Sequence, residues 1–223
     1  MLTQRNIRLV FQRMYFHLKN LHWNFFIPIV IADIFLPFIC FISYMSEKTR
    51  PLFAMTVMQF SLIIIPVCSI WWVIFINRDY IEGLGNELLF VCRNKIKTMD
   101  TFIVFILFFA VSIIQFAFYI QADSSLKYEP IKLFCICLFL YCFVQFLTYL
   151  TKSIPITLLM VLVYMIGNPM IAYSIDGVVF PIFYDITPLT MESAKASIIP
   201  MVLTGVVLLL ISVYFNKRRL RFN

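Results

Sequence analysis

Residues 101–120 read TFIVFILFFAVSIIQFAFYI, a run without a single charged residue. Apolar side chains lie on every face of a helix drawn through this run, so it has no polar stripe of the kind that a soluble helix carries. A helix of about 20 apolar residues is long enough to cross roughly 30 Å of hydrocarbon. A strand of a membrane barrel would instead alternate apolar and polar residues in segments of about ten. The run therefore predicts a transmembrane helix.

Runs of the same kind recur along the chain, and together they predict six spans. They lie near residues 24–45, 52–76, 101–121, 133–150, 154–174 and 198–215. Of the 223 residues 62% are hydrophobic and 13% are charged, whereas soluble domains are about half apolar and a quarter charged. The sequence predicts an all-α, polytopic membrane protein that forms a single domain over residues 1–223.

Basic residues are distributed unevenly around the six predicted spans. With a cytoplasmic N-terminus, the inside segments carry thirteen Lys and Arg residues and the outside segments carry five. Lys and Arg near span ends are retained on the cytoplasmic side, so we expect a multi-pass protein of the cell membrane with both termini in the cytoplasm. The net charge of +7 follows from this bias, and it requires no nucleic-acid partner.

Three segments outside the regular spans have their own patterns. Residues 4–22 mix apolar and basic residues at helical spacing, which fits an interfacial amphipathic helix or a basic flank that only fixes orientation. Gly167, Asn168 and Pro169 predict a kink or break in the fifth span, because proline cannot donate a backbone hydrogen bond. Residues 174–197 are too apolar for a solvated loop, and they predict a re-entrant extracellular element.

Motifs for catalysis and nucleotide binding are absent from the sequence. There is no GxxxxGK[ST] phosphate loop and no HExxH pair. Both histidines precede the first predicted span, and the six cysteines lack the spacing of a metal site. We therefore expect no catalytic residues, no metal site and no cofactor bound by this chain, and we expect that it is not an enzyme by itself.

The loop between the second and third predicted spans is unusually rich in charge. Residues 77–100 read NRDYIEGLGNELLFVCRNKIKTMD. Ile81, Leu84, Leu88 and Val91 recur at helical spacing within it, which predicts a short helix over residues 78–94 that lies on the cytoplasmic membrane surface. The alternative is an ordinary surface loop with solvated charges.

This loop resembles the first cytoplasmic loop of type-2 ATP-binding-cassette (ABC) permeases of the small six-span exporter type. That loop carries an acidic residue, Glu-Gly, Glu-Leu-Leu and then a basic residue before the third span, and it forms a coupling helix that docks in a groove of a separate ATPase subunit. The matching positions in this sequence are Asp79, Glu82, Gly83, Glu87, Leu88, Leu89 and Lys95. The order of six spans behind a basic N-terminal segment is also similar to that family.

The resemblance implies the permease subunit of an ATP-driven exporter, paired with a second permease subunit as a homodimer or heterodimer. ATP and Mg²⁺ would bind to the ABC ATPase subunit. The implied cargo is an amphipathic or hydrophobic molecule, such as an antimicrobial peptide, a drug or a lipid-like compound. Residues implied in coupling to the ATPase are Asp79, Glu82, Gly83, Glu87 and Arg93. Two alternatives remain open: an ATP-independent carrier, and a membrane assembly or immunity factor without transport activity.

Polar side chains within the predicted spans are candidates for a translocation path. Asp33 lies well inside the first span, where a lipid-exposed carboxylate would cost about 2.5–3.5 kcal/mol. Spans two to five each contribute one amide, namely Gln59, Gln115, Gln145 and Asn168. The amides either line a path with Asp33 or form hydrogen bonds between helices.

Overall fold

The structure is a computed structural model, and it describes residues 15, 16, 18–46, 50–81, 97–174 and 198–219. The described residues contain helices and no strand, which confirms the predicted all-α class. In chain order the elements are η1 (His22–Phe25), α2 (Phe26–Ile29), η2 (Val30–Phe35), α3 (Leu36–Ser46), α4 (Arg50–Ile81), α6 (Lys97–Ser112), α7 (Ile114–Ala122), η3 (Ser124–Tyr128), α8 (Glu129–Thr151), α9 (Ile154–Ser174) and α11 (Ile199–Arg219).

Four helical stretches among the described residues are long and apolar enough to cross a membrane. They are His22–Met45, Phe53–Ile81, Thr98–Ala122 and Ser124–Thr151. Two shorter apolar stretches follow in Ile154–Gly167 and Ile199–Tyr214. Large apolar side chains such as Phe38, Phe118 and Leu210 are exposed on the outside of the bundle. Such a surface is suited to contact with lipid. The chain is therefore a helical protein of the transmembrane type.

The first stretch is made of successive segments with different helical pitch. The 3-10 turn η1 leads into α2, and the π-helical segment η2 then precedes α3. The backbone N–H of Leu36 bonds to the carbonyl of Ile31, five residues earlier. Pro37 has no N–H for the carbonyl of Asp33, so this carbonyl loses its α-helical partner next to the π-helical segment. Asp33 thus lies in a π turn, a feature that recurs at functional sites.

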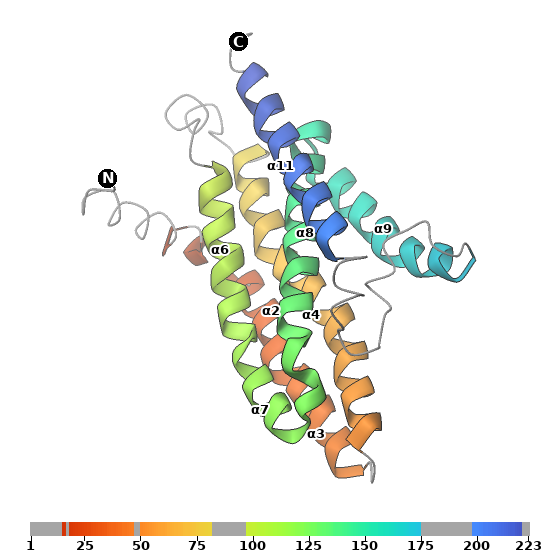
Figure 1. The fold of residues 1–223 in the computed structure, drawn as a ribbon. Coiled ribbons are helices and arrows are strands. Elements are labelled where there is room, and N and C mark those ends of the chain that lie inside the picture. The colour runs from red at the N-terminus through yellow and green to blue at the C-terminus, as the bar shows by residue number, and fades with distance from the viewer. Residues whose placement is uncertain (1–14, 17, 47–49, 82–96, 175–197, 220–223) are drawn as a thin grey trace, which may run out of the picture.

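Helix α8 lies in the interior of the bundle and packs against α4, α6, α9 and α11. Ile136, Cys137, Leu140 and Val144 on α8 are fully buried. In Figure 1 the blue α11 runs along one side of the green α8, while α4 and α6 lie on the other side. This arrangement makes α8 the helix on which α4, α6, α9 and α11 pack.

One end of the bundle, which we call the basic end, carries most of the positively charged helix ends. Here α4 ends, α6 begins, α8 turns into α9 and α11 ends (Figure 1). The basic residues at these positions are Arg78, Lys97, Lys152, Lys217, Arg218 and Arg219. The α3–α4 junction, α7 and η3 lie at the opposite end.

Helices α8 and α9 are joined by only two residues, Lys152 and Ser153. Lys152 adopts a left-handed backbone conformation with φ 54°, and its N–H bonds to the carbonyl of Thr148 at 3.0 Å. The hydroxyls of Thr151 and Thr157 lie 3.1 Å apart across the turn. The turn is therefore closed by its own hydrogen bonds.

Two helices depart from the pattern that the sequence predicts. Helix α9 continues through Gly167, Asn168 and Pro169 to Ser174, so the chain does not break there, and the kink stays a prediction. A proline removes one hydrogen bond, and the neighbouring bonds are enough to continue the helix. In the third span a turn at Ile113 separates α6 from α7, although no proline or glycine marks that position.

We expect that Gly205→Leu destabilises the protein by about 1–3 kcal/mol, because it overpacks the contact between α11 and α8. A Cβ atom on Gly205 would lie 3.4 Å from the Cα of Phe139 and 3.7 Å from the Cβ of Cys142. Alanine fits at these distances, whereas leucine must push the helices apart. Thermal unfolding of the purified variants in detergent measures the effect.

Gly167→Leu is the matched control, because a Cβ on Gly167 meets nothing within 4 Å. Gly205→Ala should unfold at the temperature of the unmodified chain. If both leucine variants unfold at the same temperature, close packing of α11 on α8 is contradicted.

Candidate functional site

The first polar cluster lies between the first span and the α6–α7 span, around Asp33. The hydroxyl of buried Ser112 in α6 faces the Asp33 carboxylate. The Cys68 thiol of α4 lies near the same carboxylate. The Oδ2 atom of Asp33 and the hydroxyl oxygen of Ser112 are both buried, and neither has a hydrogen-bond partner among the described residues. An acceptor and a donor that can satisfy each other therefore lie on facing helices.

Gln115 and Tyr119 continue this cluster along α7. They are four residues apart, so they lie on the same face of the helix, and the Tyr119 hydroxyl donates to Oε1 of Gln115 at 3.1 Å. The Tyr119 hydroxyl also interacts with the Cys40 thiol of α3. Gln115 is 9% exposed, and its Nε2 has no hydrogen-bond partner among the described residues. A buried donor on α7 is therefore also left without a partner among the described residues.

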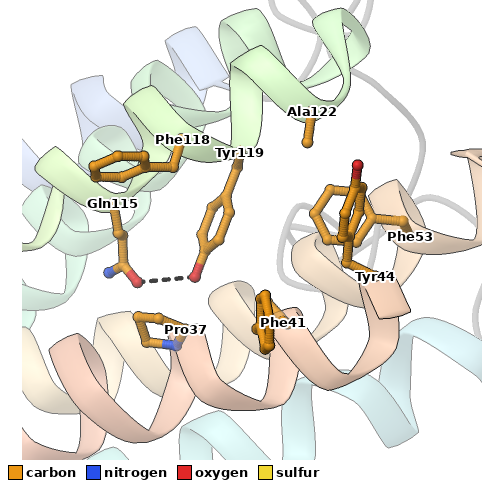
Figure 2. Close-up of a pocket in the computed structure, with 9 residues that line it drawn as sticks. Pro37, Phe41, Tyr44, Phe53, Gln115, Phe118, Tyr119 and Ala122 are labelled. Carbon is orange, nitrogen blue, oxygen red and sulfur yellow. Dashed lines mark hydrogen bonds between the residues drawn. The ribbon is translucent and has the colours of Figure 1, made fainter. Parts of the chain in front are cut away.

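A cavity of about 340 Å³ lies beside this cluster, between α3, the start of α4 and α7 (Figure 2). Its lining residues are Pro37, Cys40, Phe41, Tyr44, Phe53, Gln115, Phe118, Tyr119 and Ala122. Figure 2 places the Gln115–Tyr119 pair towards one end and the rings of Tyr44 and Phe53 towards the other. Small-molecule sites have about 300–1,000 Å³ and mostly apolar walls with few polar groups. The cavity fits that description.

The second polar cluster, which we call the basic-end network, joins α4, α6 and α8. The Tyr141 hydroxyl donates to the carbonyl of Thr98 at 2.9 Å and lies 3.1 Å from the Thr101 hydroxyl. Nε2 of Gln145 donates to the same Thr101 hydroxyl at 2.9 Å. The Tyr80 hydroxyl of α4 donates to Oδ2 of Asp100 in α6 at 3.3 Å. Each such bond between helices in a membrane contributes about 0.6 kcal/mol on average and at most about 1.7 kcal/mol.

Of the residues implied in coupling, Asp79 alone is described. It lies near the end of α4, where its Oδ1 is 3.9 Å from Nη2 of the exposed Arg78, and such a surface pair contributes little to stability. Glu82, Gly83, Glu87 and Arg93 lie outside the described residues. So do most of the predicted interfacial helix 4–22, most of the predicted coupling helix 78–94 and, except for Ser174, the predicted re-entrant segment 174–197.

The candidates for a translocation path fall in separate places. Gln115 lines the cavity, whereas Asp33 faces Ser112 and is not among the lining residues. Gln145 belongs to the basic-end network. Gln59 is exposed on α4, and the side chain of Asn168 lies outside the described residues. The described candidates therefore line no single path within one chain.

Three residues of the basic-end network, Thr98, Thr101 and Tyr141, are not among the candidates that the sequence predicts. Thr98 and Thr101 are three residues apart, and Tyr141 and Gln145 are four apart, so each pair shares a helix face. That spacing is a usable signal for the basic-end network. The cavity has no comparable signal, because its walls come from three helices. No group of three His, Cys, Asp or Glu residues in the described ranges could hold a metal ion.

Comparison with protein-family models, with curated proteins and with solved structures gave no match for this chain. The likeness of residues 79–95 to an ABC permease loop therefore stays a prediction.

Proposed function

We propose that the chain is the permease subunit of an ATP-driven exporter that moves amphipathic or hydrophobic molecules out of the cell. A separate ABC ATPase subunit binds ATP and Mg²⁺ and supplies the energy, and a second permease subunit completes the path. The helical, apolar bundle supports a membrane role. The charged loop after α4 supports the link to an ATPase.

The observation that carries this proposal is the basic-end network at the base of the charged loop. The chain leaves α4 at Ile81 and enters α6 at Lys97, so residues 82–96 connect these two helices. Tyr80 bonds to Asp100 across the two helix ends, and Tyr141 and Gln145 of α8 bond to the first turns of α6. A force applied to the loop is transferred to α8, because the helix ends are held by buried hydrogen bonds.

The full arrangement that we propose places α9 and α11 as the fifth and sixth spans. The basic end faces the cytoplasm, because its helix ends carry Arg78, Lys97, Lys152 and the last turn of α11. Residues 4–22 lie as an interfacial helix on the inner surface of the cell membrane. Residues 78–94 act as the coupling helix, and residues 174–197 form the re-entrant element on the outside.

Coupling in this arrangement depends on the charges of the loop. Asp79, Glu82, Glu87 and Arg93 contact the ATPase subunit, and Gly83 allows the two backbones to approach closely. When two ATPase subunits close on ATP, the loops move together and α8 transmits that motion to the helices packed around it. The chain described here contributes no catalytic group to hydrolysis.

We expect that Glu82→Lys lowers cargo-stimulated ATPase activity of the assembled complex by roughly tenfold or more, because a reversed charge at a docked surface opposes like charges. The complex is isolated by purifying the tagged chain from its native membrane. The unmodified chain should bring with it an ATPase subunit that contains a phosphate loop, in a ratio near one to one. Stimulation is then measured with an amphipathic peptide.

Glu47→Lys is the matched control, because the same charge change falls in a predicted extracellular segment. It should leave the stimulation unchanged. Transport that persists without any nucleotide-binding partner would exclude the exporter and favour an ATP-independent carrier. A complex with neither ATPase nor transport would favour the assembly or immunity factor.

A further inference from the structure

Asp33 is an acidic residue at the centre of the first span, at a depth where the neighbouring spans carry no positive charge. It lies halfway along the 24-residue stretch His22–Met45, and η2 packs against α4 and α6. The inner parts of the four long spans, residues 23–46, 51–77, 98–126 and 133–151, contain no Lys or Arg. Lys132, nearer the outer end of its span, is paired with Glu129. An ionised Asp33 would therefore have no counter-charge from these spans.

The side chains that face Asp33 are neutral polar groups. The Ser112 hydroxyl of α6 faces its carboxyl group, and the Cys68 thiol of α4 lies near it. Tyr119 of α7 is a further titratable group in its surroundings. Within the described ranges Asp33 forms no ion pair with a Lys, Arg or His residue. A hydroxyl or a thiol can form a hydrogen bond with a carboxyl group, but it cannot supply the positive charge that a carboxylate lacks.

Asp33 also lies at the border between the interior of the bundle and its outer surface. Its Oδ2 atom is buried, whereas the residue as a whole is only half-buried. The neighbouring side chains of Ile34 and Phe35 are 61% and 54% exposed, and such apolar surface is suited to lipid. A carboxylate at this place has protein on one side and hydrocarbon on the other. Without water or a counter-charge, a group of this kind becomes neutral rather than staying ionised.

We infer that Asp33 is a proton-binding site within the membrane and that its carboxyl group carries a proton at neutral pH. The protonated group has one O–H donor and retains acceptor oxygens, so it can form a hydrogen bond with Ser112 in either direction. Hard metal cations are less suited, because they take about six oxygen ligands or more. The described residues offer only the carboxyl group and the Ser112 hydroxyl here. The inference does not rest on the proposed exporter function, because the proton binds to this chain alone.

Reaction with dicyclohexylcarbodiimide tests the site in the full chain, reconstituted in phosphatidylcholine vesicles at neutral pH. This apolar reagent reaches carboxyl groups from the lipid, and it reacts with the protonated form. The carboxyl proton moves to one nitrogen of the reagent, and a carboxyl oxygen bonds to its central carbon. The acyl group then migrates to a reagent nitrogen and leaves a stable N-acylurea. We expect mass spectrometry to find this adduct on Asp33.

Asp33→Asn keeps the shape of the side chain, and the adduct on this span should be lost. Asp123→Asn is the matched control, because Asp123 precedes η3 at the outer end, where it accepts a hydrogen bond from the N–H of Ser125. The control should form the Asp33 adduct as the unmodified chain does. Failure of the unmodified chain to form the adduct would overturn the inference. Equal labelling of the first span in the unmodified chain and in Asp33→Asn would overturn it as well.

Infrared spectra distinguish a bound proton from a bound metal cation. A protonated carboxyl group has a C=O stretching band that is separate from the bands of a carboxylate. We expect this band in the difference between the spectra of the unmodified chain and Asp33→Asn at neutral pH. Sodium or potassium chloride should leave the band as it is in choline chloride. A carboxylate band in its place, or its loss in sodium or potassium chloride, would overturn the inference. Neither result bears on the ATPase purification, because no ATPase is present.

Discussion

Trp72→Ala is expected to lower the free energy of unfolding by about 3–5 kcal/mol, the range for truncating a buried aromatic side chain. Trp72 on α4 is 2% exposed. Its ring stacks on Phe25 at 4.9 Å with 4° between the planes, and it meets the ring of Phe108 edge-on at 5.6 Å. Its indole N–H donates to the carbonyl of Phe25 at 3.1 Å. One side chain therefore joins the start of the first span to α4 and α6.

The size of this effect follows from the depth of the site. Lipid cannot fill a space that the surrounding helices enclose, so alanine leaves a void and removes one hydrogen bond to the carbonyl of Phe25. Trp72→Phe keeps most of the ring contact and loses the hydrogen bond, so we expect a loss of about 1 kcal/mol. Unfolding by increasing fractions of sodium dodecyl sulfate in mixed micelles measures all three proteins.

Trp71→Ala is the matched control for Trp72→Ala. Trp71 is the next residue on α4, but it is only half-buried and contacts Phe75 in a tilted arrangement at 5.3 Å. Its indole N–H has no partner among the described residues, so the truncation loses no hydrogen bond there. We expect less than half the loss that Trp72→Ala causes. Equal losses at the two positions would contradict the role of Trp72 as the link between helices.

Lys132→Met is expected to cost about 3–5 kcal/mol, because it removes one charge of a buried ion pair. Nζ of Lys132 lies 3.7 Å from Oε2 of Glu129 in the first turns of α8, and both side chains are 2% exposed. A charge at such a site is costly when its counter-charge is removed. The same unfolding measurement applies.

The double variant Glu129→Gln with Lys132→Met tests whether the stability contributions of the two charges are coupled. The double variant removes both charges of the pair, so it should recover most of the stability that the single variant loses. Lys127→Met is the control, since Lys127 is exposed and lies 5.7 Å from the ring of Tyr128, where a cation contributes about 0.5–1 kcal/mol. If the single and double variants lose the same stability, the two charges are not coupled.

Span positions could be predicted because apolar length is a direct physical requirement of the bilayer. Two helices extend beyond the predicted spans, because a helix need not end where its charged residues begin. Helix α4 continues past the predicted residue 76 through Arg78 and Asp79, since nothing there breaks a helix. Helix α8 begins at Glu129 rather than 133, with Pro130 in its first turn and Lys132 buried. Charges can lie inside a helix when a partner is near.

The sites were predictable only where a residue was unusual for its surroundings. Asp33 and Gln115 stood out because a carboxylate and an amide are costly in a span. Thr98, Thr101 and Tyr141 did not, because hydroxyls are common in membrane helices and can bond to their own backbone. The cavity depends on how Phe53 and Tyr119 approach each other, with ring centroids 6.5 Å apart. Sequence patterns along single helices carry no information about such a contact.

The two-residue link between α8 and α9 has a consequence for the order in which the bundle is completed during synthesis. Helices joined by so short a link meet with very little loss of chain entropy, so α8 and α9 can associate as soon as both have left the ribosome. Helix α11 begins only at Ile199. The contact between Phe139 on α8 and Gly205 on α11 cannot form before α11 has been synthesised. We therefore expect one flank of α8 to face lipid, or another protein, until α11 arrives.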